Sequence, residues 1–167
     1  MRRIAFTAMA AVLTFGLIAA PVVQAREPGP TIVGVAVAVN AETGEFSHLI
    51  AAVQRAGLVD TLNGNRQFTV FAPTDAAFDA LFAKLGVSGV DDIPVATLRA
   101  VLLHHVAPGE RFSADVLAST RIRMLDKSFT HPAIVNGVPT IDGATIVIPD
   151  VNASNGVIHV IDEVLLP

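Results

Sequence analysis

The chain has 167 residues, no cysteine, no tryptophan and no tyrosine, and a formal net charge of −4 at pH 7. This acidic balance argues against nucleic acid or an anionic membrane surface as a partner, because both require a basic surface. The chain can form no disulfide and carry no cysteine-linked lipid, and it lacks the aromatic platforms on which many sugars and bases stack.

The first 25 residues are patterned as a secretory signal peptide. Arg2 and Arg3 form a positive n-region, residues 4–23 contain no charge, and Val23-Gln24-Ala25 supplies a small-residue cleavage site. An uncleaved anchor is the alternative, since about twenty uncharged residues can span a bilayer, but Pro21 interrupts the segment. The Arg2-Arg3 pair also leaves a twin-arginine export signal open.

Cleavage after Ala25 would leave 142 residues with nine basic and fifteen acidic side chains, a net charge of −6. That length is sufficient for one domain with a full core. We therefore expect a short leader over residues 26–30 and a single domain over residues 31–167. The protein is expected to be exported, either secreted or held in the periplasm or at the cell surface, and to meet the membrane only through an uncleaved signal segment.

The first half of the expected domain is dominated by helical patterns. Thr31 to Val39 is apolar and compatible with a helix or a strand, and we favour the helix. Apolar residues between Phe46 and Val53 follow the i, i+3, i+4, i+7 spacing of an amphipathic helix that ends near Gly57. Asn63-Gly64-Asn65 predicts a turn, and Phe68 to Phe71 predicts a short strand.

Two further helices have clear start and stop signals. Thr74 is a good N-cap with Asp75 in the first turn, and Gly86 is placed to end that helix. The next helix begins after Pro94 and ends at Ala107-Pro108-Gly109. One of its faces carries apolar side chains and a histidine: Leu98, Val101, Leu102 and His105.

Strands and tight turns dominate from Arg121 onward. Asn136-Gly137 and Asp142-Gly143 are strong hairpin dipeptides, and Thr145 to Val151 predicts a strand. Gly156 to Leu166 is a nearly unbroken apolar run, typical of a strand buried on both faces. Helices followed by strands predict an α+β domain rather than alternating parallel βαβ units.

The final apolar run contains polar residues that need partners. Period-two geometry places His159 and Asp162 on opposite faces, so they cannot form a catalytic pair with each other. Each needs a partner elsewhere, because an unpaired buried polar group costs roughly 1–3 kcal/mol. His105 on its helix face likewise needs a backbone or a carboxylate partner, and Asp75 and Asp162 are the candidate carboxylates.

Three segments carry a family resemblance: Phe68 to Phe78 (FTVFAPTDAAF), Leu102 to Gly109 (LLHHVAPG) and Asn155 to Pro167 (NGVIHVIDEVLLP). The first and last are similar to the two signature blocks of the fasciclin domain family. The middle one resembles the family's central Tyr-His segment, with His104 where many relatives carry tyrosine and His105 at the histidine. The resemblance covers roughly residues 31–167.

The resemblance implies a fasciclin-like wedge of two packed β-sheets, a β-sandwich, with several helices on one edge. It also implies an extracellular adhesion or interaction module. In animal members the Tyr-His segment has been associated with integrin recognition, a role that is not transferred here because His104 replaces the tyrosine. His104, His105 and Val106 are kept only as a candidate interaction segment.

We expect the polar residues of these blocks to form a structural network that locks the helices onto the sheet: Thr74, Asp75, His105, His159 and Asp162. Adjacent histidines on a helix diverge by about 100 degrees, so His104 and His105 cannot easily share a metal ion. No nucleophile elbow and no phosphate-binding glycine loop is present. The sequence therefore predicts no catalytic residue, no metal and no cofactor.

Two functions remain open. The first is a secreted, non-catalytic adhesion or interaction module that binds a protein or a surface or matrix glycan through exposed loops. The second is an extracytoplasmic carrier of a lipid-like small ligand, which requires a continuous apolar pocket of roughly several hundred cubic ångströms. The family resemblance favours the module, and the oligomeric state stays open.

Overall fold

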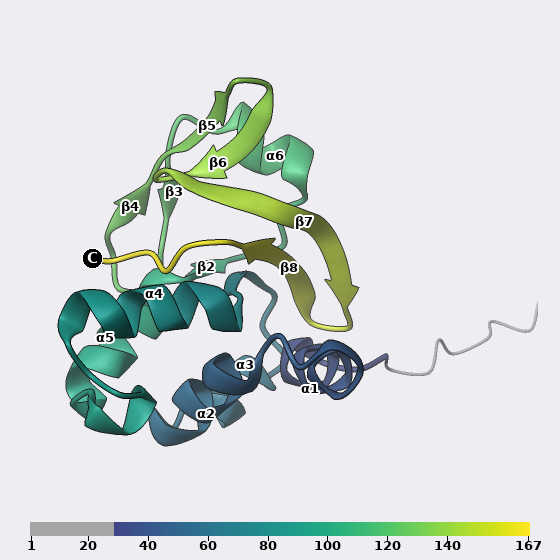
Figure 1. The fold of residues 1–167 in the computed structure, drawn as a ribbon. Coiled ribbons are helices and arrows are strands. Elements are labelled where there is room, and N and C mark those ends of the chain that lie inside the picture. The colour runs from purple at the N-terminus through teal and green to yellow at the C-terminus, as the bar shows by residue number, and fades with distance from the viewer. Residues whose placement is uncertain (1–28) are drawn as a thin grey trace, which may run out of the picture.

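Helices make up the first half of the fold and strands the second (Figure 1). This computed structural model describes residues 29–167, so the predicted signal peptide and most of the predicted leader lie outside the described residues. The helices are α1 (Ile32–Thr43), α2 (Ser47–Arg55), α3 (Val59–Leu62), α4 (Asp75–Leu85), α5 (Val95–His104) and α6 (Ser113–Ala118), with a 3₁₀ turn at Val90–Asp92. The strands are β1 (Phe68–Pro73), β2 (Val106–Pro108), β3 (Ile122–Arg123), β4 (Phe129–Thr130), β5 (Pro132–Val135), β6 (Val138–Ile141), β7 (Ala144–Ala153) and β8 (Gly156–Ile161).

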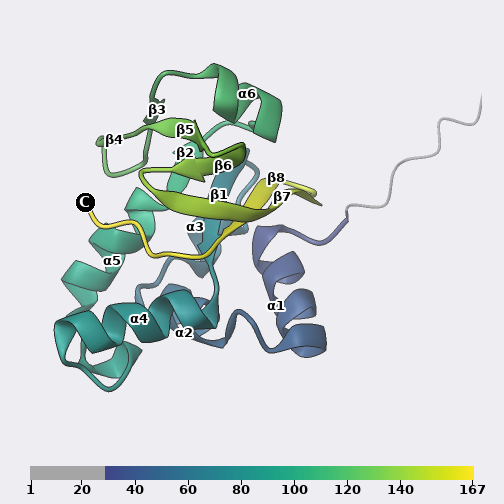
Figure 2. The ribbon, with the colours of Figure 1, turned by 45° about the horizontal axis from the view of Figure 1, so that its top comes forward.

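Six of these strands form one curled sheet in the order β2-β1-β8-β7-β6-β5, and β3 and β4 form a separate two-stranded ribbon. β1 and β8 run parallel, and the other neighbours in the sheet run antiparallel. β6 pairs with β7 only beside their shared turn, at Thr140↔Thr145 and Ile141↔Ala144, where the sheet bends (Figure 2). The α+β prediction is confirmed. The predicted sandwich of two packed sheets is not, because the described strands belong to one sheet and a ribbon.

The central strands β1 and β8 lie far apart in the sequence and are buried along their whole length. They are in register from Phe68↔Gly156 to Pro73↔Ile161. Gly156 has a φ of 151°, and a Cβ built there would lie 1.9 Å from the carbonyl oxygen of Phe68. Glycine is therefore required where the two strands first meet.

The predicted last strand is too long. β8 ends at Ile161, although the apolar pattern continues to Leu166. Pairing stops at Asp162, whose backbone N–H donates to the Thr145 carbonyl oxygen (3.1 Å) and whose carboxylate accepts from the Thr145 N–H (2.7 Å). Val164 and Leu165 are buried as part of a loop, so apolar composition alone extended the predicted strand.

The helix predictions are confirmed except at one boundary. α1 covers the segment favoured as helix and continues to Thr43. α4 begins after Thr74, whose hydroxyl accepts from the Ala77 N–H (3.3 Å), and ends at Gly86. α5 stops at His104, before the predicted end, because the next residues leave the helix and pair with β1 as β2.

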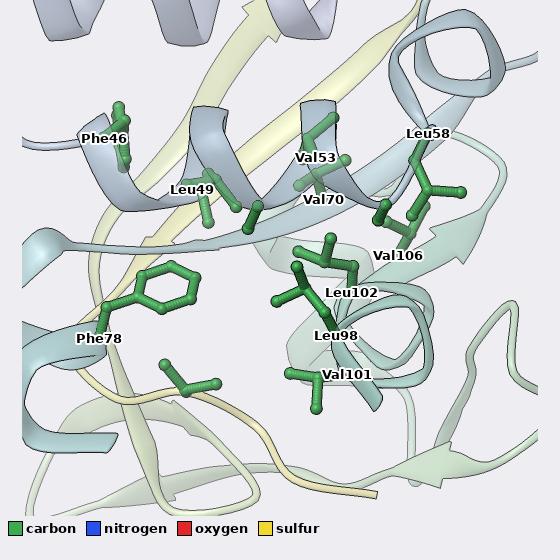
Figure 3. Close-up of a cluster of buried hydrophobic side chains, with 14 of the residues drawn as sticks. Phe46, Leu49, Val53, Leu58, Val70, Phe78, Leu98, Val101, Leu102 and Val106 are labelled. Atoms are coloured by element: carbon green, nitrogen blue, oxygen red, sulfur yellow. The ribbon is translucent and has the colours of Figure 1, made fainter. Parts of the chain in front are cut away.

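Two hydrophobic clusters lie on the two faces of the sheet. Alternation along β1 sends Val70 and Ala72 to the larger cluster and Phe71 to the smaller one. In the larger cluster, side chains of α2, α4 and α5 gather near Val70 of β1 (Figure 3), among them Leu49, Val53, Phe78, Leu98 and Leu102. The smaller cluster includes Ile122, Met124, Ile141 and Ile161. This frame positions the buried histidines described next.

Candidate functional site

His105 ties the end of α5 to the C-terminal loop. Its buried ring donates from Nδ1 to the Val101 carbonyl oxygen (2.7 Å) and accepts at Nε2 from the Leu165 backbone N–H (2.9 Å). Both ring nitrogens therefore bond to backbone atoms, one of the two alternatives left open by the sequence, and the candidate carboxylates Asp75 and Asp162 are not partners of the ring. Burial lowers the pKa of His105 to about 4 and outweighs the raising effect of the Val101 hydrogen bond.

His159 ties β8 to the neighbouring strand β7 and to the loop between β2 and α6. Its Nε2 donates to the Arg111 carbonyl oxygen (3.0 Å), and its Nδ1 accepts from the Asp150 backbone N–H (3.2 Å). The ring stacks on Phe71 with centroids 5.4 Å apart. Burial lowers the pKa of His159, against the raising effects of the Arg111 bond and the Asp150 charge. These partners require opposite neutral tautomers in His105 and His159.

Thr74 and Asp75 join β8, α4 and α2. The Thr74 backbone N–H donates to the Ile161 carbonyl oxygen (3.1 Å) at the end of β8. The Asp75 carboxylate accepts from the N–H groups of Ser47 (3.1 Å) and His48 (2.9 Å), which open α2. Asp75 therefore caps a neighbouring helix as well as standing in the first turn of its own.

The five residues expected to form a polar network lie at separate joints of the fold. The side chains of Asp75, His105, His159 and Asp162 each bond to backbone atoms of another segment, and Thr74 does so through its backbone N–H. No hydrogen bond joins the side chains of these five residues to one another. The donors and acceptors of each residue bond to backbone atoms near it, and the five side chains do not meet at a single site.

His104 has side-chain partners that sequence analysis missed. Its Nδ1 lies 2.8 Å from Asp126 Oδ2 and 2.6 Å from Ser128 Oγ, and the Ser128 hydroxyl also donates to Asp126. Partial burial acts to raise the pKa of the Asp126 carboxyl, but hydrogen bonds from Ser128 and His104 outweigh it and hold this pKa below its ordinary value. Serine and aspartate meet the same ring nitrogen, so the trio lacks the geometry of a Ser-His-Asp relay.

The candidate interaction segment is inside the protein. His104, His105 and Val106 are 4%, 2% and 3% exposed. A partner could reach these three side chains only if the end of α5 opened. We therefore do not propose this segment as a contact surface.

Asn155 is a second structural residue that sequence analysis missed. Its side-chain oxygen accepts from the Ile32 N–H (2.8 Å) at the start of α1, and its amide donates to the carbonyl oxygens of Leu62 (2.6 Å) and Gly64 (3.1 Å). The turn between β7 and β8 is thereby joined to α1 and to the end of α3. The local sequence pattern does not predict hydrogen bonds between residues that lie so far apart in the chain.

Potential metal ligands do not cluster in the part of the chain that the structure describes. Within residues 29–167 no group of three or more His, Asp and Glu side chains lies close enough together to hold a metal. Every buried side-chain nitrogen and oxygen in this part of the chain has a hydrogen-bond partner. No helix of the described part is long and apolar enough to cross a membrane.

Two apolar surface features remain. The first, which we call the hairpin patch, consists of Ile134, Val135 and Val138 on the β5–β6 hairpin, which are 64%, 51% and 42% exposed. Val135 and Val138 are cross-strand partners on one face of the hairpin, and Ile134 lies on the other face. The second, which we call the α1 cavity, has a volume of about 400 Å³ and lies between α1 and the β7–β8 side of the sheet. Its walls are apolar, with Val35 and Val39 of α1 facing Val151 of β7 and Val160 of β8.

The fold and the three sequence segments described above are those of a known family of domains. The chain belongs to the fasciclin domain family, whose model, described as "Fasciclin domain", matches residues 44–167. The match begins just after α1.

Individual relatives support the same assignment. The chain is 41% identical over 133 residues to "Protein sll1483" of Synechocystis sp., an alignment that covers 80% of this chain and 72% of the relative. It is 33% identical over 112 residues to "Cell surface glycolipoprotein MPB83" of Mycobacterium bovis, covering 66% of this chain and 48% of that protein. Among solved structures, a FAS1 domain pair from the insect cell adhesion molecule Fasciclin I matches with a TM-score of 0.68 at 22% identity, over 84% of this chain and 52% of the pair. This last likeness shows the fold.

Proposed function

We propose that this chain is an exported, non-catalytic adhesion or interaction module and that the hairpin patch is its contact surface. The observation that carries the proposal is the exposure of three aliphatic side chains on one hairpin. Exposed apolar groups that gather at one place are typical of protein-binding surfaces. The patch contains no aromatic ring on which a sugar could stack, so its composition favours a protein partner over a glycan.

The hydrogen bonds that polar side chains make within the fold support the same proposal. The buried histidines and the Asp75 and Asp162 carboxylates described above bond to backbone atoms within the fold. Recognition is left to exposed surfaces. One relative is named as a cell-surface glycolipoprotein, which supports an extracytoplasmic location for this chain.

Attachment of protein-coated beads to cells of the source organism tests this function. The double variant Ile134→Ser/Val135→Ser removes the most exposed side chains of the hairpin patch and should abolish attachment. Leu85→Ser is the matched control, because Leu85 is 53% exposed on α4, away from the hairpin. Equal attachment by the double variant and the wild-type protein would contradict the proposed surface.

The α1 cavity favours a second candidate function, a carrier of a lipid-like ligand. Its volume of about 400 Å³ falls in the range of small-molecule sites, and its lining is almost entirely apolar. Native mass spectrometry of the protein purified from its own host tests this function. A co-purifying small molecule would support the carrier, and a mass equal to that of the polypeptide alone would contradict it.

A further inference from the structure

The α1 cavity exists because α1 packs loosely on the sheet. Of the twelve residues of α1, only Ile32 and Val35 are buried, although almost every side chain from Ile32 to Val39 is apolar. A helix that is apolar on all sides is normally covered on all sides. Here a smaller cavity of about 70 Å³ lies along α1 as well, and both cavities are lined by Ala36, Ala72 and Ile158.

The opposite wall of the cavity also exposes aliphatic side chains. The pairing of β7 with β8 is irregular between Ile146 and Val151, and Asp150 has a φ of 60°. This bulged stretch leaves Val147 and Ile148 54% and 52% exposed where they line the cavity. An apolar chain bound between α1 and β7 would remove this surface from water, which is the main driving force for binding in apolar pockets.

The polar end of the cavity selects against negative charge. Thr43 and Glu45 line it there, and Glu45 is the one charged residue among the lining residues. The Glu45 side chain has no hydrogen bond or ion pair within residues 29–167. Thr43 is the last residue of α1, and the C-terminus of a helix carries partial negative charge. Thr74 and Phe46, which open α4 and α2, also line the cavity, but the first N–H groups of these helices already donate to the Thr74 hydroxyl and the Asp75 carboxylate. No basic residue lines the cavity.

We propose that the α1 cavity binds a single-chain lipid whose head group donates hydrogen bonds and carries no negative charge. The aliphatic chain lies between α1 and β7, and the hydroxyl or ammonium head lies at Thr43 and Glu45. A carboxylate or phosphate head is rejected, because it would meet the Glu45 carboxylate and the helix C-terminus. This inference rests on the carrier function proposed above and names the class of ligand.

A matched series of fourteen-carbon compounds tests the inference. The full chain, purified from an exporting host, is titrated at pH 7.5 with tetradecylamine, tetradecanol and tetradecanoate below their micellar concentrations, and bound Nile red is displaced. The amine and the alcohol should displace the dye, and the carboxylate should bind at least about tenfold more weakly than the amine. Glu45→Gln should reduce the preference for the amine over the carboxylate, whereas Glu42→Gln, in the last turn of α1 and outside the cavity lining, should not.

A second set of variants tests whether the compounds bind in the α1 cavity. Ala36→Leu places extra volume in the cavity and should abolish binding of all three compounds, while Ala38→Leu, at an exposed position of α1 outside the cavity, should leave binding unchanged. Ile148→Ser should also weaken binding. Because Ile148 is exposed on the cavity wall, this substitution leaves the packing of the buried core unchanged. If no compound binds the wild-type protein, the carrier function is wrong. If all three bind equally, or the carboxylate binds best, the carrier function stands and the head-group selection is wrong.

Discussion

Replacement of His105 offers the sharpest test of how this fold is held together. In His105→Ala, the Val101 carbonyl oxygen and the Leu165 N–H lose their buried partner. Each unpaired buried group costs about 1–3 kcal/mol, and the space left by the ring adds to the loss. We therefore expect the free energy of unfolding to fall by about 3–5 kcal/mol.

Two conservative variants separate the two hydrogen bonds. An asparagine amide can occupy the position of Nδ1 and donate to Val101, and a glutamine side chain can reach toward Leu165 as Nε2 does. His105→Asn and His105→Gln should each lose about 1.5–3 kcal/mol, less than His105→Ala. His131→Ala is the control, because the His131 side chain is 65% exposed, and it should change stability by no more than about 0.5 kcal/mol.

Urea unfolding followed by far-ultraviolet circular dichroism measures these differences, because the chain has no Trp or Tyr for fluorescence. If His105→Ala unfolds within about 0.5 kcal/mol of the wild-type protein, the buried ring does not hold α5 to the C-terminal loop. If the asparagine and glutamine variants are no more stable than the alanine variant, the ring acts by filling space rather than through its hydrogen bonds.

Three further predictions concern the same frame. The folded-state pKa of His105, about 4, lies below its ordinary value of 6.5, so the unfolded chain binds more protons between these two pH values. The stability contributed by the neutral ring is therefore complete above pH 6.5 and is lost as the pH falls toward 4, by up to about 3 kcal/mol. Urea midpoints measured across this pH range will test this expectation. Gly156→Ala places a Cβ 1.9 Å from the Phe68 carbonyl oxygen, and because backbone must move to relieve this contact, we expect a loss of about 3 kcal/mol or more, or no folded protein, as judged by thermal melting. Asp75→Ala leaves the first N–H groups of α2 without their acceptor and should lower the free energy of unfolding by about 1–2 kcal/mol, with faster amide hydrogen exchange in α2.

The features that sequence analysis predicted well depend on local chemistry. Thr74 and Gly86 bound α4 because a hydroxyl cap and a left-handed residue suffice to start and stop a helix. The two hairpin dipeptides have positive φ at both positions, 53° and 82° at Asn136-Gly137 and 46° and 94° at Asp142-Gly143. That is the geometry for which Asn-Gly and Asp-Gly are favoured.

The features that sequence analysis missed depend on where distant segments meet. Leu165 lies 60 residues from His105 and Ile32 lies 123 residues from Asn155, yet each pair shares a hydrogen bond. An apolar pattern shows that a histidine is buried, but it does not show which backbone atoms will face the ring. The α1 cavity was equally hidden, because a cavity is the space that packing leaves and has no residue pattern of its own.

The central claim is that His105 and His159 are neutral structural groups and that recognition occurs at exposed surfaces. Long-range ¹H–¹⁵N NMR of the histidine rings between pH 3.5 and 8 tests it directly, with the exposed His131 ring as the reference for a solvent-accessible imidazole. The structure predicts that at pH 7.5 His105 is neutral with its proton on Nδ1 and His159 is neutral with its proton on Nε2, and that His105 stays neutral at pH 6. Rings that exchange between tautomers at pH 7.5, or a His105 ring that is already protonated at pH 6, would contradict the claim.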